Sequence, residues 1–577
     1  MIKKIVRRVS SAQINSFISN PVLARVYANR GVEDAESVNY SMKNLYSPEA
    51  LKGVDAAVDI LFDALSSEKS ICIVGDFDAD GATSTALSVR ALLAFGFHNV
   101  NYVVPNRFEY GYGLTPEIVD LANTFKPDVI LTVDNGISSV EGVAAAKKLG
   151  MSVIITDHHL PGKHLPNADA IVNPNQPDCK FPCKNLAGVG VVFYLLSALR
   201  AFLRKRDWFA EHDRDEPNMA SYLDLVALGT IADVVPLDGN NRILVAQGLQ
   251  RIRAGHCCAG IRALLTIANK NIHTVVSSDL AFAVGPRLNA AGRLDDMSLG
   301  IQCLLSDSIY EAEKIARELN DLNLARREIE LQMQQEAMAL LDKLDNEFQP
   351  QKSFGIGVYR DEWHEGVIGI LASRIKEKFH RPTIVFARTR DGEYKGSGRS
   401  IEGVHLRDVL DEVATSSPGI LNKFGGHAMA AGLSISGPRL EEFIELFDAC
   451  IARHLNHTFP QAEIFSDGQL SGGELNVENA LALRNAGPWG QAFPEPVFDG
   501  EFRVLQQRML KDKHLKLLLS AEEYSGEAID GIAFNVDTVI WPNEDVKRVH
   551  LVYRLEVNEY RGNVNPQILI EQIEAVV

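Results

Sequence analysis

The chain has 577 residues, of which 46% are hydrophobic and 23% charged, a composition typical of globular proteins and not of disordered or fibrous ones. This length exceeds what one hydrophobic core usually supports, so several domains are expected. The net charge of -17 argues against a protein that coats duplex DNA by electrostatic attraction alone, but it leaves room for a nucleic-acid enzyme with a local basic channel.

The cysteines and the hydropathy pattern indicate a cytoplasmic protein. Seven cysteines are scattered and never form a CxxC pair, so we expect reduced thiols and neither a disulfide framework nor a zinc site. The first residues are basic and lack the apolar core of a secretory signal. No later stretch reaches the roughly 18 continuous apolar residues of a membrane span.

Residues 1–50 look helical and polar. In the next segment, residues 51–308, short β-branched runs alternate with helix-like stretches. The strand-like runs have the sequences "ICIVG", "NYVVP", "DVILTVD" and "SVIITD". Strands that alternate with helices at this spacing predict βαβ units and a parallel sheet, whose loops at the carboxyl ends of the strands meet at one edge. The predicted class is therefore α/β.

Three further segments follow. Ile309–Leu344 is rich in Ala, Leu, Glu, Arg and Gln and lacks Gly and Pro, which predicts one long helix or two abutting ones, a connector over residues 309–345. Residues 346–456 predict a second α/β domain, with strand-like "GIGVY" and "TIVFA" around the helix-like "VIGILASRIKEKF". Residues 457–577 are β-rich and interrupted by Pro and Gly, which suits a small antiparallel barrel.

Acidic and imidazole groups follow three of the predicted parallel strands, and a fourth apolar run, residues 225–237, contains another carboxylate near its end. We expect all of these groups to converge on one edge of the sheet. They are Asp76, Asp78, Asp80, Asp134, Asp157, His158, His159 and Asp233.

Such a concentration of carboxylates predicts a metal site. Carboxylates this close repel one another unless a cation lies among them, and a mixture with imidazole suits Mn²⁺ or Mg²⁺ better than Zn²⁺. Two ions about 3.5 to 4 Å apart lower the pKa of a bound water and clamp both oxygens of a phosphoryl transfer. Taken alone, "DFDADG" fits a solvated acidic turn equally well. Together with "VDNG" and "DHH" at the same edge, it favours phosphoester hydrolysis.

These motifs resemble a known family. "DFDADG", "VDNG", "DHH" and "GTIADVVPL", in this order, resemble the four motifs of the DHH phosphoesterase superfamily. Further stretches, among them "LAGVGVVFYL", "GPRLNAAGRLDD" and "WHEGVIGILASRI", are similar to the RecJ family of bacterial single-strand-specific DNA exonucleases. The resemblance covers nearly the whole chain. It implies a DHH domain, a DHHA1-type domain and an oligonucleotide-binding (OB) barrel.

The resemblance also implies an activity and a set of metal ligands. The activity is 5′ to 3′ hydrolysis of single-stranded DNA to mononucleotides in recombination and repair, with two Mn²⁺ or Mg²⁺ ions. Asp134 matches the carboxylate that bridges the two ions and is part of the catalytic machinery. The implied ligands are Asp78, Asp80, Asp134, His158 and Asp233.

Two neighbours of these ligands receive roles from the resemblance. His159 matches the histidine that contacts the scissile phosphate and assists proton transfer. Asp157 is expected to orient the adjacent imidazoles, as metal-bound histidines generally require. Asp224 is close enough in sequence to compete with Asp233, but the "GTIAD" context favours Asp233.

One position departs from the family pattern. Many superfamily members carry a histidine ligand four residues before the first paired carboxylate, and Val74 stands there in this chain. The sequence leaves open whether Asp76 replaces that ligand.

Candidate substrate-binding residues lie outside these motifs. "KGSGRSIEG" offers Ser397, Arg399 and backbone amides in a Gly-rich turn, a combination suited to a terminal phosphate, although an ordinary hairpin turn fits the same letters. The resemblance implies 5′-phosphate recognition by Arg107, Ser397 and Arg399. It also implies that further residues line the same cleft, namely Arg287, Asn289 and His427.

The predicted barrel carries a local positive charge. The stretch "RVLQQRMLKDKHLK" has five Arg or Lys and one Asp, a local net charge of +4 in an acidic chain. It suits a nucleic-acid strand, and a solvated strand face explains it equally well. A channel between two domains joined by a helix can admit a single strand and exclude a duplex.

Two other classes of function compete with the exonuclease. A smaller-substrate phosphoesterase (a manganese pyrophosphatase, a cyclic-dinucleotide phosphodiesterase or an oligoribonuclease) is expected to need only the two α/β domains, so the barrel favours a polymer. A replication scaffold derived from this fold would be marked by lost carboxylates, and all are present. There is no GxxxxGK[ST] phosphate loop, so a motor activity is not predicted. The resemblance suggests a RecQ-type helicase and single-strand-binding protein as partners, and a monomer is expected.

Overall fold

The computed structural model describes residues 2–9, 17–105, 113–344, 353–360, 363, 365–389, 392–426, 428–521, 528–560 and 562–576. The chain forms two compact units. The small unit consists of Met1–Arg7 and Ala325–Ser466, and the large unit of Arg8–Leu324 and Asp467–Val577. Within the described ranges, no helix is both long and apolar enough to span a membrane.

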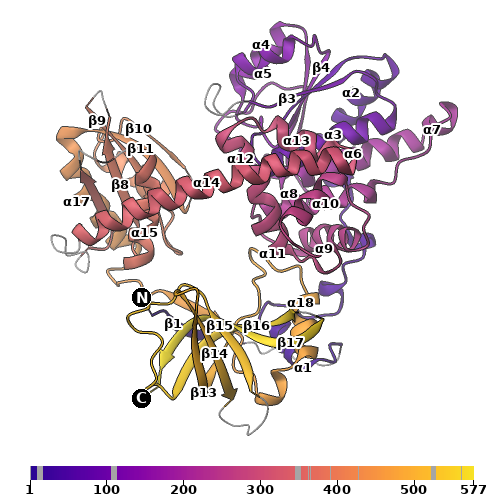
Figure 1. Ribbon diagram of the computed structural model, residues 1–577. Coiled ribbons are helices and arrows are strands. Elements are labelled where there is room, and N and C mark those ends of the chain that lie inside the picture. Colours follow the sequence, from indigo (N-terminus) through magenta and orange to yellow (C-terminus); the bar gives the residue numbers. More distant parts are fainter. Residues whose placement is uncertain are drawn as a thin grey trace. The chain divides into compact units, whose positions relative to one another are not determined.

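The large unit is built around a five-stranded parallel sheet with helices on both faces (Figure 1). The strand order is β3-β2-β4-β5-β6, and every neighbouring pair is parallel. The strands are β2 (Ile71–Val74), β3 (Val100–Val103), β4 (Val129–Val133), β5 (Ser152–Thr156) and β6 (Ala170–Val172). The predicted α/β class with a parallel sheet is confirmed, and the sequence analysis had missed β6.

Alternating side chains of the strands enter two separate cores, which explains why these strands are apolar throughout. Ile71, Ile73 and Leu131 pack in one core with side chains of three helices, whereas Cys72 and Ile130 pack in the other with two helices. The first face is covered by α2 (Val54–Ser66), α3 (Ala79–Phe95) and α6 (Gly188–Arg204). The second is covered by α4 (Pro116–Asn123) and α5 (Val140–Lys148).

The strand order creates a topological switch point between β2 and β4. The chain leaves β2 for β3 on one side and then returns to β4 on the other side of β2, so the connections diverge at the carboxyl ends of this pair. Ligand sites of α/β proteins form in the crevice at such a point. The register pairs Val74 with Thr132 and Val133 with Thr156, so the loops after β2, β4 and β5 leave the sheet at one edge.

A layer of helices completes this part of the large unit. The apolar run at residues 225–237 is not a strand, because it begins inside helix α8 (Leu223–Ala232), and Asp233 follows the last turn of that helix. The remaining elements are α7 (Trp208–Glu211), α9 (Gly239–Arg253), α10 (Ala259–Ile267), α11 (Ser277–Asp279), the π-helical turn η6 (Leu280–Val284), α12 (Gly285–Leu294) and α13 (Ser298–Leu305).

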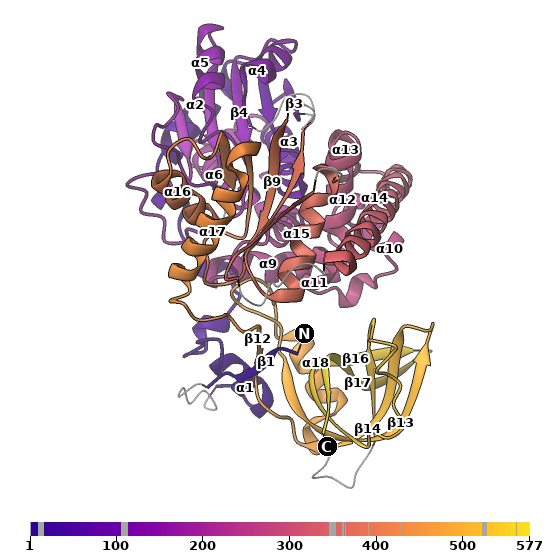
Figure 2. The same ribbon diagram turned by 90° about the vertical axis from the view of Figure 1, so that its left-hand side faces the viewer.

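The C-terminal part of the large unit is a closed five-stranded barrel (Figure 2), as predicted. Its order is β13-β14-β15-β17-β16, and one pair, β15 with β17, is parallel rather than antiparallel. The elements are α18 (Val477–Asn485), β13 (Phe498–Leu510), β14 (His514–Ala521), β15 (Ile529–Ala533), β16 (Arg548–Tyr560) and β17 (Asn563–Ala575).

The N-terminal segment is only partly helical. Its described residues, 2–9 and 17–50, contain a strand, a helix and three short 3₁₀ turns, namely β1 (Lys4–Arg7), α1 (Pro21–Ala28), η1 (Glu36–Val38), η2 (Met42–Asn44) and η3 (Pro48–Ala50). Arg30, just after α1, makes two 3.0 Å hydrogen bonds to the carboxylate of Asp467, and both side chains are buried. Removing one member of such a buried pair costs about 3–5 kcal/mol, so this contact ties the N-terminal segment to the start of the barrel region.

The small unit contains a mixed five-stranded sheet in the order β10-β11-β9-β8-β7, in which only β7 and β8 are parallel. Strand β1 pairs in parallel with β12 (Glu463–Ser466) in a separate two-stranded sheet. The elements of this unit are β7 (Ile356–Arg360), α15 (Glu365–Phe379), β8 (Thr383–Arg388), β9 (Glu393–Arg399), α16 (Leu406–Ser416), β10 (Lys423–Gly426), β11 (Ala430–Ser436) and α17 (Leu440–His454).

The predicted connector is a single continuous helix, α14 (Ile309–Leu344). It begins in the large unit and continues into the small one, since the boundary between the units falls at Leu324.

Candidate metal centre and substrate-binding residues

The loop after β2 presents its carboxylates at the start of helix α3. Asp78 is the N-cap of α3, and its Oδ1 accepts a hydrogen bond from the Gly81 amide at 3.0 Å. Asp80 is buried in the first helical turn. Its two oxygens accept hydrogen bonds from the amides of Gly188 (2.6 Å) and Val189 (2.9 Å) at the N-terminus of α6. The unpaired amides and the dipole of that helix end stabilise the charged carboxylate.

Asp134 follows β4 in a conformation that few residues adopt. Its φ is +62°, a left-handed value that aspartate and asparagine tolerate better than other residues with a Cβ. A Cβ on Gly188 would lie 2.5 Å from the Cβ of Asp134, so the "LAGVG" stretch needs glycine at this position. The adjacent Asn135 donates hydrogen bonds to the carbonyls of Val74 (3.0 Å) and Val133 (2.9 Å), which ties the end of β2 to the end of β4.

The "DHH" loop after β5 is organised by Asp157. Its Oδ1 accepts hydrogen bonds from the backbone amides of His158 (2.7 Å) and His159 (3.0 Å) and lies 2.8 Å from Nδ1 of the His159 ring. Its Oδ2 accepts from the amide of Ile137 at 2.8 Å. Asp157 therefore fixes the main chain of both histidines but the ring of His159 alone.

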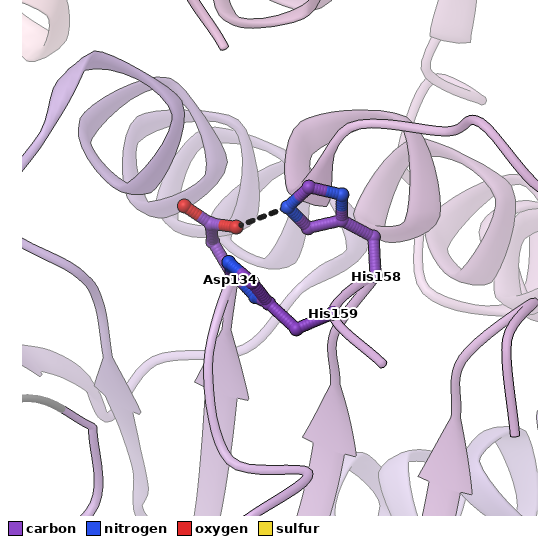
Figure 3. A group of neighbouring side chains, drawn as sticks. All are labelled: Asp134, His158 and His159. Atoms are coloured by element: carbon purple, nitrogen blue, oxygen red, sulfur yellow. Dashed lines mark ion pairs between the residues drawn. The ribbon is translucent and has the colours of Figure 1, made fainter. Parts of the chain in front are cut away.

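His158 points its Nε2 at carboxylate oxygens. This atom lies 3.2 Å from Oδ1 of Asp134 and 3.5 Å from Oδ2 of Asp233 (Figure 3 shows the contact with Asp134). Nε2 is buried and has no hydrogen-bond partner within the described part of the chain. This nitrogen thus faces two carboxylate oxygens without a well-aligned hydrogen bond to either.

The side chains form three overlapping groups, in each of which the ligand atoms lie within 4.8 Å of one another. One group is Asp76, Asp78 and Asp134, another is Asp80, His158 and Asp233, and the third is Asp134, His158 and His159. Asp134 belongs to two groups, as a carboxylate between two ions would. Asp224 is in none of them, because its carboxylate accepts from the amides of Leu225 and Cys258 inside the helical layer.

Burial and mutual repulsion disfavour the charged form of these carboxyls. Burial, with the neighbouring charge of Asp78, raises the pKa of Asp76 to about 8 and the pKa of Asp80 to about 7. Burial, with the charge of Asp80, raises the pKa of Asp233 to about 9 and the pKa of Asp134 well above its usual value. Perturbed carboxyls gathered at a switch point indicate a functional site.

The two histidines are shifted in opposite directions. Burial, with the charge of His159, lowers the pKa of His158 to about 4, so His158 is a neutral ring. Burial also acts to lower the pKa of His159, but the hydrogen bond and the charge of Asp157 outweigh it and raise this pKa to about 9. The bonds that Asp157 accepts, foremost from the His159 ring, keep its own pKa below the usual value despite burial.

This donor set fits divalent ions such as Mn²⁺ or Mg²⁺. Adjacent ligands around an octahedral ion with bonds of about 2.1 Å lie about 3 Å apart, close to the spacing of His158 from Asp134 and Asp233. A cation among these atoms also offsets the mutual repulsion of the buried carboxylates. Oxygen ligands with one neutral imidazole suit Mn²⁺ and Mg²⁺, and no thiolate takes part in the groups.

Position 74, where many superfamily members carry a histidine ligand, holds an apolar side chain. Val74 is fully buried among the apolar side chains of the sheet. Asp76, two residues later, lies with Asp78 and Asp134. The structure therefore places a carboxylate, rather than the side chain at position 74, beside the first pair of ligands.

Helix α12 packs against the loop that carries the first carboxylates. Oδ1 of Asn289 accepts a hydrogen bond from the amide of Ala79 at 2.7 Å, directly between Asp78 and Asp80. Arg287 donates to the carbonyl of Ala283 at 2.6 Å and to Oδ1 of Asn320 at 3.2 Å. The structure thus brings Asn289 to the main chain of the loop that carries Asp78 and Asp80, the metal loop.

Two of the predicted phosphate-binding residues lie together on β9 in the small unit. Arg399 donates to the Ser397 hydroxyl at 3.2 Å and to the carbonyl of Gly398 at 2.8 Å, and burial lowers the pKa of its guanidinium. A Cβ on Gly369 of α15 would lie 3.3 Å from both side chains, so this glycine keeps the approach to them open. Arg107 and His427 lie outside the described residues.

The basic stretch of the barrel forms the hairpin of β13 and β14. Arg503, Arg508, Lys511 and Lys513 are exposed, whereas Lys516 pairs with Asp530 at 2.8 Å. The hairpin therefore presents four exposed basic side chains to solvent.

The sequence analysis missed Asn135, Gly188 and Gly369. Asn135 sits inside the quoted "VDNG" motif, and the glycines sit inside quoted family stretches. Their roles cannot be predicted from the residue type alone, because each residue acts through a neighbouring segment that the fold brings close. A tight approach between two segments is what makes each of them necessary.

The fold and the site together define a phosphoesterase of the DHH class. The model of the DHH family, N-terminal domain, matches residues 70–230, and the DHHA1 domain matches residues 352–453. A third model, the RecJ OB domain, matches residues 466–572.

Relatives that match almost the whole chain identify its family within the DHH class. The chain is 55% identical to the single-stranded-DNA-specific exonuclease RecJ of Salmonella typhimurium over 553 residues, 96% of each chain. It is 48% identical to the RecJ of Haemophilus influenzae over 577 residues, 100% of each chain. The chain belongs to the RecJ family.

A solved structure supports this assignment. The RecJ of Thermus thermophilus in complex with Mn²⁺ matches with a TM-score of 0.77 at 30% identity, and the match covers 100% of this chain and 79% of that one. The Mg²⁺ complex of the same protein matches with a TM-score of 0.72. Both ions are those that the donor set favours.

Proposed function

We propose that this chain is a metal-dependent exonuclease that hydrolyses single-stranded DNA from its 5′ end to 5′-mononucleotides, in recombination and repair. One observation carries the proposal: three overlapping groups of carboxylates and imidazoles meet at the switch point of the sheet. The chain around them resembles, over almost its full length, proteins named single-stranded-DNA-specific exonucleases.

The ligand groups suggest how two ions are shared. We assign Asp76, Asp78 and Asp134 to one ion, and Asp134, Asp80, His158 and Asp233 to the other. Asp134 would then be shared by both ions, and Asp76 would take the place of the histidine that many superfamily members carry. When bound, two such ions supply an activated water and a clamp for both oxygens of phosphoryl transfer.

His159 contributes a proton at the reacting phosphate. With its pKa raised to about 9, the ring is protonated at neutral pH. Nδ1 is held by Asp157, so Nε2 is the atom that donates a hydrogen bond to a phosphoryl oxygen and then assists proton transfer to the leaving oxygen. Asp157 keeps the imidazolium in this orientation, as the carboxylate of a catalytic triad does for its histidine.

The 5′ end of the strand is held by other residues. Ser397 and Arg399 provide a hydroxyl and a guanidinium for the 5′-phosphate, together with Arg107 and His427, and a charge-assisted contact of this kind discriminates a phosphate from a hydroxyl. Asn289 and Arg287 line the path of the strand next to the metal loop. Fixation of the 5′ end explains stepwise removal of single nucleotides.

The barrel adds affinity for a single strand. Its basic hairpin offers exposed cations that track a phosphate backbone. We place the enzyme in the cytoplasm as a monomer, where a RecQ-type helicase opens the duplex and single-strand-binding protein covers the product strand.

A single degradation assay tests the proposal. A single-stranded DNA oligonucleotide with a 5′ phosphate and a 3′ fluorophore is incubated with Mn²⁺ or with EDTA, beside the same strand blocked at its 5′ end. We expect shortening of the open strand only, with Mn²⁺ only. Survival of the DNA while pyrophosphate or a cyclic dinucleotide is hydrolysed would refute the substrate but keep the metal centre. No hydrolysis of any of them would indicate a non-enzymatic scaffold.

A further inference from the structure

The loop after β6 contacts the main chain of both histidines of the metal centre. In this loop, of sequence "VNPNQ" over residues 172–176, Nδ2 of Asn175 donates to the carbonyl of His158 at 2.6 Å. Nδ2 of Asn173 donates to the carbonyl of His159 at 3.0 Å. Asp157 binds the amides of the same two residues, so the peptide groups of the histidines are held from both sides.

The two asparagines also hold each other. Oδ1 of Asn173 accepts a hydrogen bond from the amide of Asn175 at 2.7 Å, and Asn173 is fully buried. A buried amide group with both of its ends bonded is fixed in one orientation, because any rotation leaves polar atoms unsatisfied. The loop therefore has little freedom to shift relative to the histidines.

Asn175 also reaches the segment before α6. Its Nδ2 donates to the carbonyl of Lys184 at 3.1 Å. The same segment continues into the amides of Gly188 and Val189 that hold Asp80. One side chain thus connects the main chain of His158 to the segment that positions Asp80.

We propose that Asn173 and Asn175 are positioning residues of the metal centre. They fix the main chain of His158 and His159 so that Nε2 of His158 faces Asp134 and Asp233 before an ion binds. This inference rests on the metal centre in the proposed function and is independent of the DNA substrate. Outer partners of metal-binding histidines contribute to affinity because they remove the need to reorder the ligand on binding.

The same loop supplies a matched control. Gln176 is buried, and its Nε2 donates to the carbonyls of Lys52 (3.0 Å) and Ile171 (2.7 Å). These are bonds of the same kind as those of the asparagines, but they lead away from the histidines. A role in loop stability alone predicts similar effects for all three side chains, whereas positioning predicts a difference.

The experiment compares Asn173→Leu, Asn175→Leu and Gln176→Met in the full chain. Each change removes the amide without adding charge. Mn²⁺ affinity is measured by calorimetric titration of the metal-free protein, and the melting temperature is measured in EDTA. We expect Mn²⁺ binding to weaken by about 10- to 100-fold in the asparagine variants, as for other partners of metal-bound histidines. For Gln176→Met we expect a lower melting temperature with Mn²⁺ affinity within about twofold of wild type, because its bonds support only the loop.

Several outcomes would overturn the inference. Wild-type affinity in both asparagine variants would do so, as would an equal loss of affinity in Gln176→Met. If Asn175→Leu does not fold, Asn175→Asp replaces it: lost positioning weakens Mn²⁺ binding despite the added negative charge, and tighter or unchanged binding contradicts the proposal. A wild type that binds Mn²⁺ but leaves DNA intact refutes the exonuclease and leaves this inference testable. A wild type that binds no Mn²⁺ refutes both.

Discussion

The metal centre and strand β9, which we propose binds the 5′ phosphate, hold their functional groups in different ways. At the metal centre, Asp80 and Asp157 accept hydrogen bonds from backbone amides, and the backbone of His158 is held by the side chains of Asp157 and Asn175. On β9, Ser397 and Arg399 are half-buried and bind mainly each other and their own strand. Crowded like charges require a rigid frame, because each group alone would move away from the others. A cationic side chain that binds the end of a flexible DNA strand requires no such frame.

The largest effect on activity is expected from loss of the carboxylate that we assign to both ions. Asp134→Asn keeps a residue that tolerates the left-handed φ of +62° but removes the carboxylate shared by two ligand groups. We expect exonuclease activity to fall by about a thousandfold or more, since interactions that act in the transition state carry terms of this size. The rate of nucleotide release from a 5′-phosphorylated strand measures it.

A matched control exists for this substitution. Asp178 also has a φ of +62°, but its side chain is 91% exposed. Asp178→Asn should leave the rate of release unchanged. Retained activity in Asp134→Asn would contradict the assignment of Asp134 as the bridge.

Loss of the proposed contact between Arg399 and the 5′ phosphate should cost less free energy than loss of Asp134. Arg399→Ala removes a charge-assisted hydrogen bond worth about 1.5–3 kcal/mol, which is about a ten- to hundredfold loss in kcat/KM for a 5′-phosphorylated strand. The loss should appear mainly in KM, and the preference for a 5′ phosphate over a 5′ hydroxyl should disappear. Lys423→Ala, an exposed lysine on edge strand β10, serves as the control. An unchanged phosphate preference would rule out Arg399 as the recognition residue.

Protons should compete with Mn²⁺ for the carboxylates of the metal centre. The pKa values of Asp80, Asp76 and Asp233, raised by burial to about 7, 8 and 9, mean that these groups retain protons near neutral pH. Mn²⁺ displaces those protons, so its affinity should rise from pH 6 to pH 9, by up to about tenfold per pH unit for each proton displaced. Calorimetric titration across this range measures the affinity.

The same shifts set the sign of the pH dependence of stability. A carboxyl whose pKa is higher in the folded than in the unfolded state stabilises the fold below its unfolded pKa and loses this contribution as the pH rises through the folded value. The metal-free protein should therefore melt at lower temperature at pH 9 than at pH 6, and Mn²⁺ should remove most of the difference. A metal-free melting temperature that rises over this range would contradict the crowded, buried site.

The smallest effect is expected at the barrel. Lys511 and Lys513 are exposed at the tip of the β13–β14 hairpin. Replacing both by Ala should weaken single-strand binding a few-fold and reduce the slope of log affinity against log salt by about 0.7 for each phosphate that the protein no longer neutralises. Fluorescence anisotropy in EDTA at several salt concentrations measures both quantities. Lys205→Ala, an exposed lysine after α6, should change neither, and an unchanged slope in the double variant would favour a merely solvated strand face.

The sequence by itself determined which chemistry the chain carries. The runs before Asp76, Asp134 and Asp157 are short and apolar on both faces, which favours buried strands, and their alternation with helical stretches predicted a parallel sheet with those residues at one edge. The long helix and the barrel could also be predicted, because their signals are local. The helix is a stretch without Gly or Pro, and the barrel is a β-rich stretch interrupted by turns.

Only the tertiary structure decided how the site is completed. Asp233 arrives from the end of a helix rather than a strand, and Asp76 joins Asp78 and Asp134. Asn173 and Asn175 reach the histidines from the loop after β6, a strand that the sequence analysis had missed. Arg30 likewise reaches Asp467 across 437 positions of the chain. Metal ligands can be predicted from the sequence because their side chains have a characteristic chemistry. The role of an amide that binds a backbone carbonyl cannot, because it depends on which two segments the fold brings together.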